Sequence, residues 1–477
     1  MNLLDLVRVR EWWEAPWRGM PEFAQSRAPR FAQIDVQFRS KEDHRAFRRT
    51  IAAYGHFFGK ASTGVKPFII FSGEPHKRDR WIWVDGGAPV LPQYPIYIVS
   101  KGRAAKQLTA KQLTSRALQQ MGVPHYVVVE EKERAWYEAY RYPFATLLVL
   151  DPKYQQQYET FDELGATKSK GPGPARNFAW EHAIAHGHAW HWVMDDNIQS
   201  FYRLGHNRKV LVRSGAIFRA MEVFCERYEN VYMAGPAYEM FAPSRQKHPA
   251  FITNTRIYSC NLIRNDIPYR WRGRYNEDTD LSLRILKGGH CTVQFFAFLQ
   301  NKLGTQRLTG GNTAEFYEPD KALDAAILAR PEWAQVDVTK LRAGGTAAKS
   351  QMLYHMHPDV TRLCVRWGRP HHDVDYTPFE RNTLQPTPGV VLPDGPNEFG
   401  MVQEPVMRRR RSAAPVSGRV PVRYDPGMPD AIRVHFNSQI DIEKFAEITG
   451  LRFENDGDMV FFPAAPTAGA SATAELG

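Results

Sequence analysis

The order of apolar segments between Pro95 and Asp196 is the feature that most constrains the fold of this chain. Strand-like runs at Pro95–Ser100, His125–Glu130, Ala145–Leu150 and His191–Met194 alternate with helical patterns at Lys106–Met121, Lys132–Tyr140 and Pro174–His186. Strands separated by helices form a mostly parallel sheet through right-handed crossovers. Such sheets bind ligands at the carboxyl ends of their strands. We therefore expect an α/β domain with a ligand site at that edge.

A repeat links the two ends of the chain. The pattern Ile-x-Val-x-Phe-x-Ser-x-x-Asp-x-x-x-Phe occurs at residues 34–47 and again at 432–445. The alternating apolar residues predict a half-buried strand, and the serine with an acid three positions later predicts the capped start of a helix. We expect two small α+β modules that flank the central domain. Their role is open between packing or dimerisation and contact with nucleic acid, because such patterns do not identify ligands.

These patterns divide the chain into five parts. They are an N-terminal α+β module at 1–92 with its repeat copy at 32–84, a catalytic domain at 93–376, a linker rich in Pro and Arg at 377–425, a C-terminal module at 426–463 and a disordered tail at 464–477. The linker holds the run Arg408–Arg411, which is either a solvated charge run or a site that neutralises phosphates.

Charge and composition narrow the partners and the compartment. The 62 Lys and Arg residues exceed the 51 Asp and Glu residues by 11, which favours an anionic partner such as nucleic acid or a nucleotide. The four cysteines are far apart, so neither a zinc cluster nor a secreted disulfide framework is expected. Charged residues interrupt the N-terminus, and no apolar run is long enough to span a membrane. We expect a cytoplasmic protein.

An acidic segment, Asp195-Asp196-Asn197, follows the last of the four strands. Side-chain oxygens are ligands that suit Mg²⁺ or Mn²⁺, and such a cation neutralises charge on a departing diphosphate. The structural alternative is an acidic turn or a helix cap.

Basic and glycine-rich segments precede the acidic one. Ser100, Lys101 and Arg103 follow the first strand, and Gly173, Arg176 and Asn177 open the helix before the last strand. A glycine-rich helix start presents backbone N–H groups to a phosphate or a base, and an arginine adds a cation. No Walker lysine–serine pair follows, so this segment alone is a weak phosphate loop. Together the segments predict a donor site, with simple surface charges as the alternative.

Three acids, Glu277, Asp278 and Asp280, lie at the predicted start of an amphipathic helix. Helix capping explains acids at this position, but three exceed what capping needs. A carboxylate near the anomeric carbon of a sugar can accept the proton of an attacking hydroxyl, and crowding by like charges raises its pKa.

Two further groups extend the predicted site. Arg270, Trp271, Arg272 and Arg274 mix basic and aromatic side chains, a composition that suits a DNA base and its phosphates, although a structural loop with exposed arginines is equally consistent. His371, in the cluster Pro370–Asp373, is a candidate metal ligand, with a structural histidine as the alternative.

The order of four motifs resembles the GT-A glycosyltransferases and, more closely, the phage TET-associated glycosyltransferases. The motifs are Ser-Lys-Gly-Arg after the first strand, Gly-x-Gly-x-Ala-Arg-Asn, Asp-Asp-Asn and Asn-Glu-Asp-Thr-Asp, and the resemblance covers about Tyr94 to Tyr376. It implies a GT-A fold, a nucleotide-sugar donor with UDP-sugar as the first choice, Mn²⁺ or Mg²⁺, and DNA with hydroxymethylated pyrimidines as the acceptor. For a phage protein the compartment is the host cytoplasm.

The resemblance also implies roles for individual residues. Asp195 faces the nucleotide ribose, while Asp196 and Asn197 lie at the metal-bound diphosphate. Asp278 is the leading base, supported by Glu277 and Asp280. The common GT-A motif ends in Asp, and here position 197 is Asn. This departure weakens the expected metal site but keeps an oxygen ligand.

Other functions stay open at this level. One is a GT-A enzyme that acts on a saccharide, lipid or protein. Another is a metal-dependent nuclease or phosphotransferase that uses the same acids on DNA. A third is a non-catalytic DNA-binding protein in which the acids are only caps.

Overall fold

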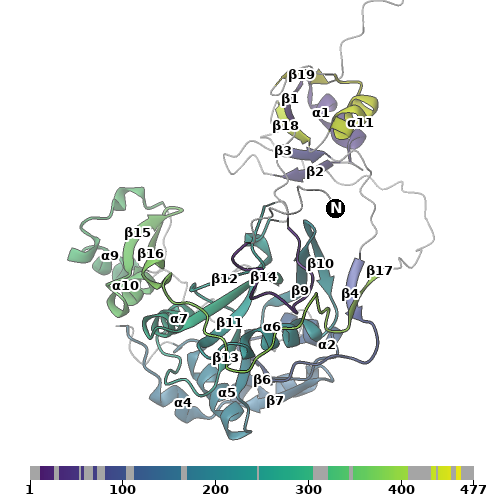
Figure 1. Cartoon of the computed structure of the whole chain (residues 1–477). Helices are drawn as coiled ribbons and strands as arrows, with labels where there is room; N and C mark the ends of the chain where they lie inside the picture. The colour runs from purple at the N-terminus through teal and green to yellow at the C-terminus, as the bar shows by residue number, and fades with distance from the viewer. Residues whose placement is uncertain are drawn as a thin grey trace, which may run out of the picture. The chain divides into compact units, whose positions relative to one another are not determined.

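The computed structural model describes residues 11–25, 32–52, 55–58, 68–71, 81–103, 112–162, 169–243, 246–303, 321–342, 347–406, 431–436, 439–452 and 458–462. The chain divides into two compact units (Figure 1). The larger unit comprises Met1–Ser26 and Trp81–Glu404, and the smaller unit comprises Arg27–Arg80 and Pro405–Gly477.

A large mixed sheet runs through the larger unit. Its strands are, in spatial order, β17 (Met401–Pro405), β4 (Trp81–Asp85), β10 (Arg208–Val212), β9 (Ile198–Gly205), β14 (Cys291–Lys302), β11 (Val231–Tyr238), β13 (Cys260–Arg264), β8 (Trp190–Asp195), β5 (Ile96–Val99), β6 (His125–Val129) and β7 (Ala145–Val149). A short strand, β12 (Phe251–Thr253), pairs with β14 off this path.

The four strands predicted from the sequence, β5 to β8, are parallel neighbours, which confirms that part of the prediction. The connecting helices are α2 (Leu113–Gln120), α3 (Arg134–Tyr140), α4 (Pro152–Gln157) and α5 (Gly173–Ala185). Beyond β8 the sheet is mixed, because β13 is antiparallel to both β8 and β11. Since β8 and β11 are both antiparallel to β13, they run parallel to each other. Strand β11 and its parallel neighbour β14 therefore end at the same edge as β8.

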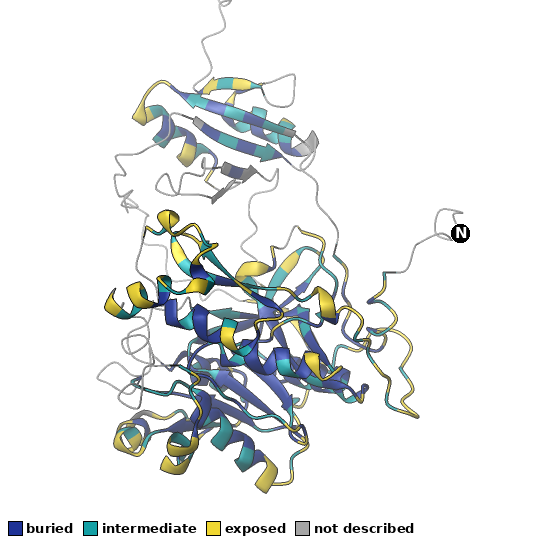
Figure 2. Ribbon diagram, turned by 90° about the vertical axis from the view of Figure 1, so that its left-hand side faces the viewer, coloured by how far each residue is buried: buried dark blue, intermediate teal, exposed yellow. Residues whose placement is uncertain are grey.

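Each face of the parallel part packs against its own helices. Side chains alternate across a strand. Ile96 and Ile98 of β5 therefore join a core with α2 and α6 (Ala216–Glu226), whereas Tyr97 and Val99 join a second core with α5 and α7 (Glu277–Lys287). Figure 2 shows the central strands as mainly buried. Apolar residues on both faces are typical of a parallel sheet that helices cover on both sides.

Chain segments outside the predicted catalytic domain complete the larger unit. Trp13 and Trp17 are buried in its first core. The predicted linker at 377–425 packs on this unit as far as residue 404, because Phe379 and Met401 are buried anchors. Asn382 Nδ2 also donates to the carbonyls at the end of α7 and just after it, at 2.8 and 2.9 Å. The described part of this segment is therefore a packed strap.

The remaining elements of this unit are short. They are α9 (Lys321–Leu328), α10 (Ala347–Met356), the hairpin of β15 (Thr361–Arg366) and β16 (Arg369–Val374), and the 3₁₀ turns η4 (Glu131–Glu133), η5 (Glu239–Phe241), η6 (Pro331–Trp333), η7 (Val338–Lys340) and η8 (Thr377–Phe379).

The smaller unit contains both copies of the repeat. Its elements are β1 (Ala32–Phe38), α1 (Lys41–Thr50), β2 (Gly55–Phe58), β3 (Phe68–Phe71), β18 (Ala431–Phe436), α11 (Gln439–Thr449) and β19 (Met459–Phe462). The strands form one sheet in the order β19-β1-β18-β3-β2. Strand β4, which the sequence assigns to the first copy, lies in the larger sheet instead.

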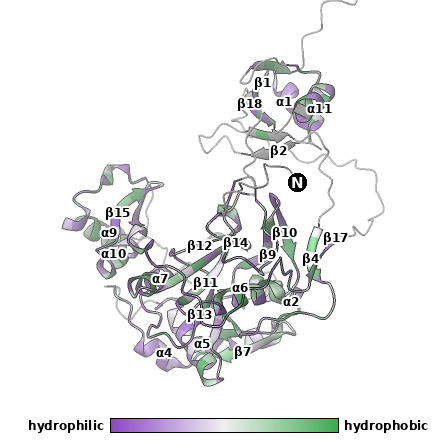
Figure 3. Cartoon of the chain, in the orientation of Figure 1, coloured by the Kyte–Doolittle hydropathy of each residue, from purple (hydrophilic) through white to green (hydrophobic). Residues whose placement is uncertain are grey.

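The two copies pair with each other, whereas the sequence predicts two separate modules. Strands β1 and β18 are antiparallel, with Ile34 opposite Val434. The rings of Phe47 and Phe445 lie 6.1 Å apart in the shared core. Helix α1 is largely hydrophilic (Figure 3), so only one face of it enters this core. A single copy has too little apolar surface for a core of its own, which explains the pairing.

Some predictions concern residues that the structure does not describe. Ser40 caps α1 by accepting from the Asp43 N–H at 3.1 Å, but its counterpart Ser438 lies outside the described residues. The same holds for Arg408–Arg411 and for the predicted tail at 464–477. Within the described residues, no helix has both the length and the apolarity needed to cross a bilayer.

The shared core predicts that damage to one repeat copy loosens the other. Replacing the fully buried Phe445 by alanine removes a large side chain and is expected to cost about 3 kcal/mol or more of stability. Hydrogen exchange should then quicken in β1 and α1 of the other copy. Phe461→Ala, at a half-exposed position, is the matched control. Unchanged exchange in β1 would contradict the shared core.

Candidate active site

Three strands bring polar side chains to one edge of the large sheet. Asp195 ends β8, Tyr238 ends β11 and Lys302 ends β14. Lys302 Nζ donates to Asp195 Oδ2 at 2.6 Å and to Ser259 Oγ at 2.7 Å. Ser259 Oγ also lies 2.6 Å from the Tyr238 hydroxyl. The predicted edge of the sheet thus carries a cluster of interacting polar side chains. Sequence reasoning missed two of them, Lys302 and Ser259.

Arg176 joins the two acidic segments. Its Nη2 donates to Asp195 Oδ1 at 2.8 Å, and its Nη1 lies 3.1 Å from Glu277 Oε1. The guanidinium carbon also stands 4.6 Å from the ring centre of Trp271. Only 3% of the Arg176 side chain is exposed. An unpaired charge at this depth is costly, so the bridge constrains both acids to lie close together.

Asp195 is held in its ionised form. Burial opposes ionisation, but Lys302 and then Arg176 hold the pKa of this carboxyl well below its usual range. In turn Asp195 raises the pKa of Lys302, although burial lowers it. Because both carboxylate oxygens are in ion pairs, Asp195 is a poor candidate for direct metal ligation.

Asp196 and Asn197 retain uncommitted oxygens. Asp196 Oδ2 accepts from Ser100 Oγ at 2.8 Å and Arg103 Nε at 3.3 Å, whereas its Oδ1 has no hydrogen bond among the described residues. Burial raises the pKa of Asp196, with Arg103 opposing this effect. Asn197 Oδ1 is also buried without a partner in the described part of the chain. Oxygens of this kind are the ligands that hard cations prefer.

His371 is not joined to this pair. It lies on β16, and its Nδ1 is 2.7 Å from the carbonyl oxygen of His372. No contact links it to Asp196 or Asn197 among the described residues. Across those residues, no group of three or more His, Cys, Asp or Glu side chains is placed to hold a metal.

The other predicted donor-site residues hold the framework. A β-carbon at Gly173 would lie 1.8 Å from the Tyr158 hydroxyl oxygen, so glycine is needed for packing. Asn177 accepts from the Trp271 N–H and donates to its carbonyl, both at 2.9 Å. Lys101 Nζ lies 3.3 Å from Glu130 Oε1. Of the predicted residues on α5, Arg176 alone contacts the acids in the described structure.

Asp280 is a buried anchor. It has no exposed surface and accepts from His357 Nε2 at 2.9 Å, from Arg284 Nε at 2.8 Å and from Arg272 Nη2 at 3.1 Å. Burial opposes ionisation, but His357 and Arg284 lower the pKa of Asp280 overall. It therefore stabilises the start of α7 and is not free to contact a ligand.

Glu277 and Asp278 differ in their surroundings. Burial raises the pKa of Glu277 to about 7, with Arg176 opposing and Asp278 adding to the rise. Asp278 is only half-buried, and its Oδ1 accepts from the Thr279 N–H at 2.8 Å. Its Oδ2 has no hydrogen bond within the described residues. Asp278 is consequently the carboxylate of this segment that is most available to a substrate.

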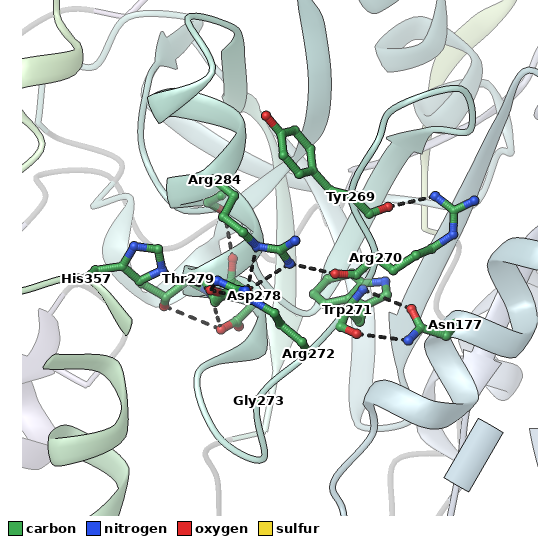
Figure 4. Close-up of polar contacts among 12 residues, drawn as sticks. Asn177, Tyr269, Arg270, Trp271, Arg272, Gly273, Asp278, Thr279, Arg284 and His357 are labelled. Carbon is green, nitrogen blue, oxygen red and sulfur yellow. Dashed lines mark hydrogen bonds and ion pairs between the residues drawn. The ribbon is translucent and has the colours of Figure 1, made fainter. Parts of the chain in front are cut away.

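The basic and aromatic segment before α7 makes several internal contacts, among them the two bonds between Trp271 and Asn177 (Figure 4). Arg270 Nε donates to Glu181 at 2.8 Å, and Arg274 is buried against Asp162. Trp271 is 2% exposed, and Arg272 pairs with Asp280. Sequence composition suggests a surface for DNA; Trp271 and Arg274 are buried, whereas Arg270 and Arg272 keep 38% and 31% of their side-chain surface exposed.

The structure adds groups that sequence reasoning missed. The guanidinium carbon of Arg256 lies 5.0 Å from the ring centre of Tyr258. Burial lowers the pKa of Arg256 and raises that of Tyr258, and the charge of Asp278 adds a smaller upward effect on both. The sequence contained an indication of Lys302, because this lysine ends the apolar strand segment that begins at Cys291. A polar residue at a strand end can reach the same sheet edge as Asp195. The sequence contained no indication of Arg256, since this residue lies between two strands in a stretch without a motif.

Comparison with known proteins supports the resemblance. Residues 94–311 match the model of the TET-Associated Glycosyltransferase family. This match confirms the resemblance to these enzymes, and it indicates a glycosyltransferase. It includes the segments of β5, α5, β8 and α7 that carry the acids and cations described above. A search of curated proteins found no match.

The roles of Asp278 and Asp280 predict opposite effects on stability. Asp280→Asn weakens three buried interactions and is expected to lower the free energy of unfolding by about 3 kcal/mol. Asp278→Asn, at a half-buried position, should leave it nearly unchanged. Denaturant unfolding of both variants measures this difference. Equal losses would show that Asp280 is not the anchor of α7.

The raised pKa of Glu277 predicts a pH-dependent contribution to stability. The folded state holds the proton more tightly than the unfolded state, so the contribution is complete below about pH 4.5 and is lost as the pH rises through about 7. Relative to Glu277→Gln, the wild-type protein should lose roughly 3 kcal/mol over this interval. Unfolding free energies of both proteins across this range test it, and parallel curves would contradict the shift.

Proposed function

We propose that this chain transfers a sugar from a nucleotide diphosphate donor to a hydroxymethylated pyrimidine base in DNA. The family match supports a glycosyltransferase with a nucleotide-sugar donor and a DNA acceptor. The observation that carries the proposal is the Arg176 bridge, which gathers Asp195 and the start of α7 at one edge of the sheet. A donor and an acceptor must meet at a single place, and this edge offers both cations and a free carboxylate.

The sheet supports the GT-A assignment that we propose for the domain. Four parallel strands with crossover helices end at the edge that carries Ser100 and the segment 195–197. Open α/β sheets bind nucleotides outside the carboxyl ends of their strands. The nucleotide is therefore expected above β5 and β8, with Asp195 toward the ribose.

Lys302 and Arg176 favour an anionic donor at this edge. Both are buried cations paired with Asp195, and they are fixed before any ligand arrives. Preorganised charge stabilises a leaving diphosphate without reorganisation during the reaction. A UDP-sugar is the first donor to test.

A divalent cation, Mn²⁺ or Mg²⁺, fits next to these groups. The unpartnered Oδ1 atoms of Asp196 and Asn197 would hold it, and the remaining ligands would come from the diphosphate and water. When bound, such a cation neutralises negative charge on the departing diphosphate. Ser100 and Arg103 keep the Asp196 carboxylate oriented through its other oxygen.

Asp278 is the base in this proposal. Its free oxygen accepts the proton of the hydroxymethyl hydroxyl while the hydroxymethyl oxygen attacks the anomeric carbon of the sugar. A carbon–oxygen bond forms there, and the bond from the same carbon to the diphosphate oxygen breaks. Glu277 stays paired with Arg176 and holds it in place. Asp280 keeps α7 in position and takes no part in the proton transfer.

The net charge supports DNA as the acceptor. An excess of 11 basic residues favours a polyanion over a neutral saccharide, lipid or protein. In the segment 269–274, Trp271 and Arg274 are buried, whereas Arg270 and Arg272 are ion-paired but keep 38% and 31% of their side-chain surface exposed. These two arginines stay candidates for contact with DNA.

The proposal predicts transfer to modified DNA that depends on Asp278. The full chain is incubated with Mn²⁺, a panel of nucleotide sugars and oligonucleotides that carry 5-hydroxymethylcytosine, 5-hydroxymethyluracil or unmodified bases. The mass of a hydroxymethylated oligonucleotide should rise by one sugar, and that of unmodified DNA should not. Asp278→Asn should slow transfer by about 10²- to 10⁴-fold, the usual contribution of a general base. Asp266→Asn, an exposed position, is the control.

Other outcomes identify the competing functions. Transfer of the sugar to a saccharide or protein but to no DNA would overturn DNA as the proposed acceptor. Cleavage of the DNA backbone with metal and without a sugar donor would indicate a nuclease. Full activity in the presence of a chelator would overturn the proposed cation but would leave the proposed transferase activity in place.

A further inference from the structure

The hairpin of β15 and β16 carries an exposed tryptophan at its tip. Arg366 and Arg369 stand opposite each other where the strands end, so the loop consists of Trp367 and Gly368 alone. Trp367 is 84% exposed, more than any other tryptophan among the described residues. A large apolar ring held in water lacks the stabilisation that burial would give it. The ring is therefore available to a partner, and it lies outside the residues that match the family, 94–311.

The backbone of this turn is poorly suited to tryptophan. The φ angles of Trp367 and Gly368 are +52° and +71°, so both loop residues are left-handed, as in a type I′ turn. The Arg342 N–H holds the turn by donating to the Gly368 carbonyl at 2.9 Å. A type I′ turn favours Asn-Gly, because a bulky side chain is strained in the left-handed region. Folding alone would favour asparagine at position 367, so the ring points to a role in binding.

Arginines lie around the exposed ring. Because side chains alternate along a strand, Arg362, Arg366 and Arg369 share one face of the hairpin with His371. The rings of Trp367 and His371 lie 5.6 Å apart, edge to face, which places the indole on this side. Within the described residues Arg362 and Arg369 have no ion pair, and Arg366, whose partner is a carboxylate on β16, is half exposed. This face favours an anionic partner that also offers a stacking surface.

The hairpin is fixed to the helix that carries the acids. Val374, at the end of β16, packs against a core that contains Leu283 and Leu286 of α7. Helix α10 packs on both strands of the hairpin (Figure 1), and His357, just after α10, bonds to Asp280 at 2.9 Å. Strands of six residues extend about 20 Å from this root to the tip. The tip is thus a rigid contact point well beyond the acids.

We propose that this tip binds single-stranded DNA, with Trp367 stacked on one base and with Arg362 and Arg369 on neighbouring phosphates. The inference rests on the proposed function, because it takes the partner of the chain to be DNA. Aromatic rings beside basic side chains hold single strands irrespective of sequence, since every base has a stacking face. A paired duplex covers those faces. A neutral saccharide would use the ring but would gain nothing from the arginines.

Binding is measured on the full chain by the fluorescence anisotropy of a labelled single-stranded oligonucleotide without modified bases, so the readout needs no sugar transfer. Trp367→Asn should weaken binding about tenfold, as expected for the loss of one stacked base. Asparagine suits the turn better than tryptophan, so the same variant should be at least as stable to denaturant as the wild type. Trp367→Phe should keep most of the affinity. On a fully paired duplex, Trp367→Asn and the wild type should bind alike.

Two further variants test the charges and the specificity of the effect. Arg369→Gln should lower the slope of log affinity against log salt concentration by about 0.7, the value for one phosphate contact on a single strand. Trp136→Ala is the matched control, because Trp136 is a half-exposed tryptophan on α3 whose neighbour Arg134 is ion-paired with Glu138. It should bind DNA as the wild type does.

The outcomes separate the hairpin contact from the proposed reaction. Wild-type affinity in Trp367→Asn, or an equal loss in Trp136→Ala, would overturn the contact while leaving any observed sugar transfer intact. A changed oligomeric state in Trp367→Asn with unchanged DNA affinity would also overturn it, in favour of a contact between copies of this chain. A specific loss in Trp367→Asn, together with no sugar transfer by the wild type, would uphold the contact and overturn the proposed reaction.

Discussion

The guanidinium of Arg176 is the group on which the candidate active-site edge depends. It is buried, and its two nitrogens face carboxylates from distant parts of the chain, Asp195 after β8 and Glu277 at the start of α7. A buried cation shared by two carboxyl groups has little freedom to rearrange, because its displacement would leave a buried charge without compensation. Lys302 adds a second cation to Asp195 from the end of β14. The edge thus carries its charges in a fixed arrangement.

This arrangement divides the acids by task. Asp195 and Asp280 are both ionised, yet both are committed, the first to two cations and the second to two arginines and a histidine. Asp196 and Asp278 each keep one oxygen without a hydrogen bond in the described structure. The committed acids hold β8 and α7 in position. The uncommitted oxygens are those to which the proposed function assigns a cation and a proton. A chemical site built on such a framework needs little reorganisation when its substrates arrive.

The smaller unit shows a different constraint. Strands β1 and β18 come from opposite ends of the chain and lie side by side, so the apolar residues of each repeat copy complete the core of the other. Two short strand–helix units reach a stable size only by pairing. The strap at 377–404 packs on the larger unit, and the chain re-enters the smaller unit after it.

Local patterns in the sequence were sufficient to predict strands β5 to β8, the acidic residues at the end of β8 and the acidic residues at the start of α7. Alternation of apolar residues, helix-start chemistry and strand-end polarity are all local properties, so they can be read from neighbouring positions. Which strands become neighbours is decided by packing over the whole domain. That packing placed Lys302 against Asp195, buried Arg274, and paired two repeats that the sequence shows as separate. Composition indicated charges and aromatic groups near α7, but only the tertiary structure decided which of them face a ligand, because burial and ion pairing depend on residues far away in the chain.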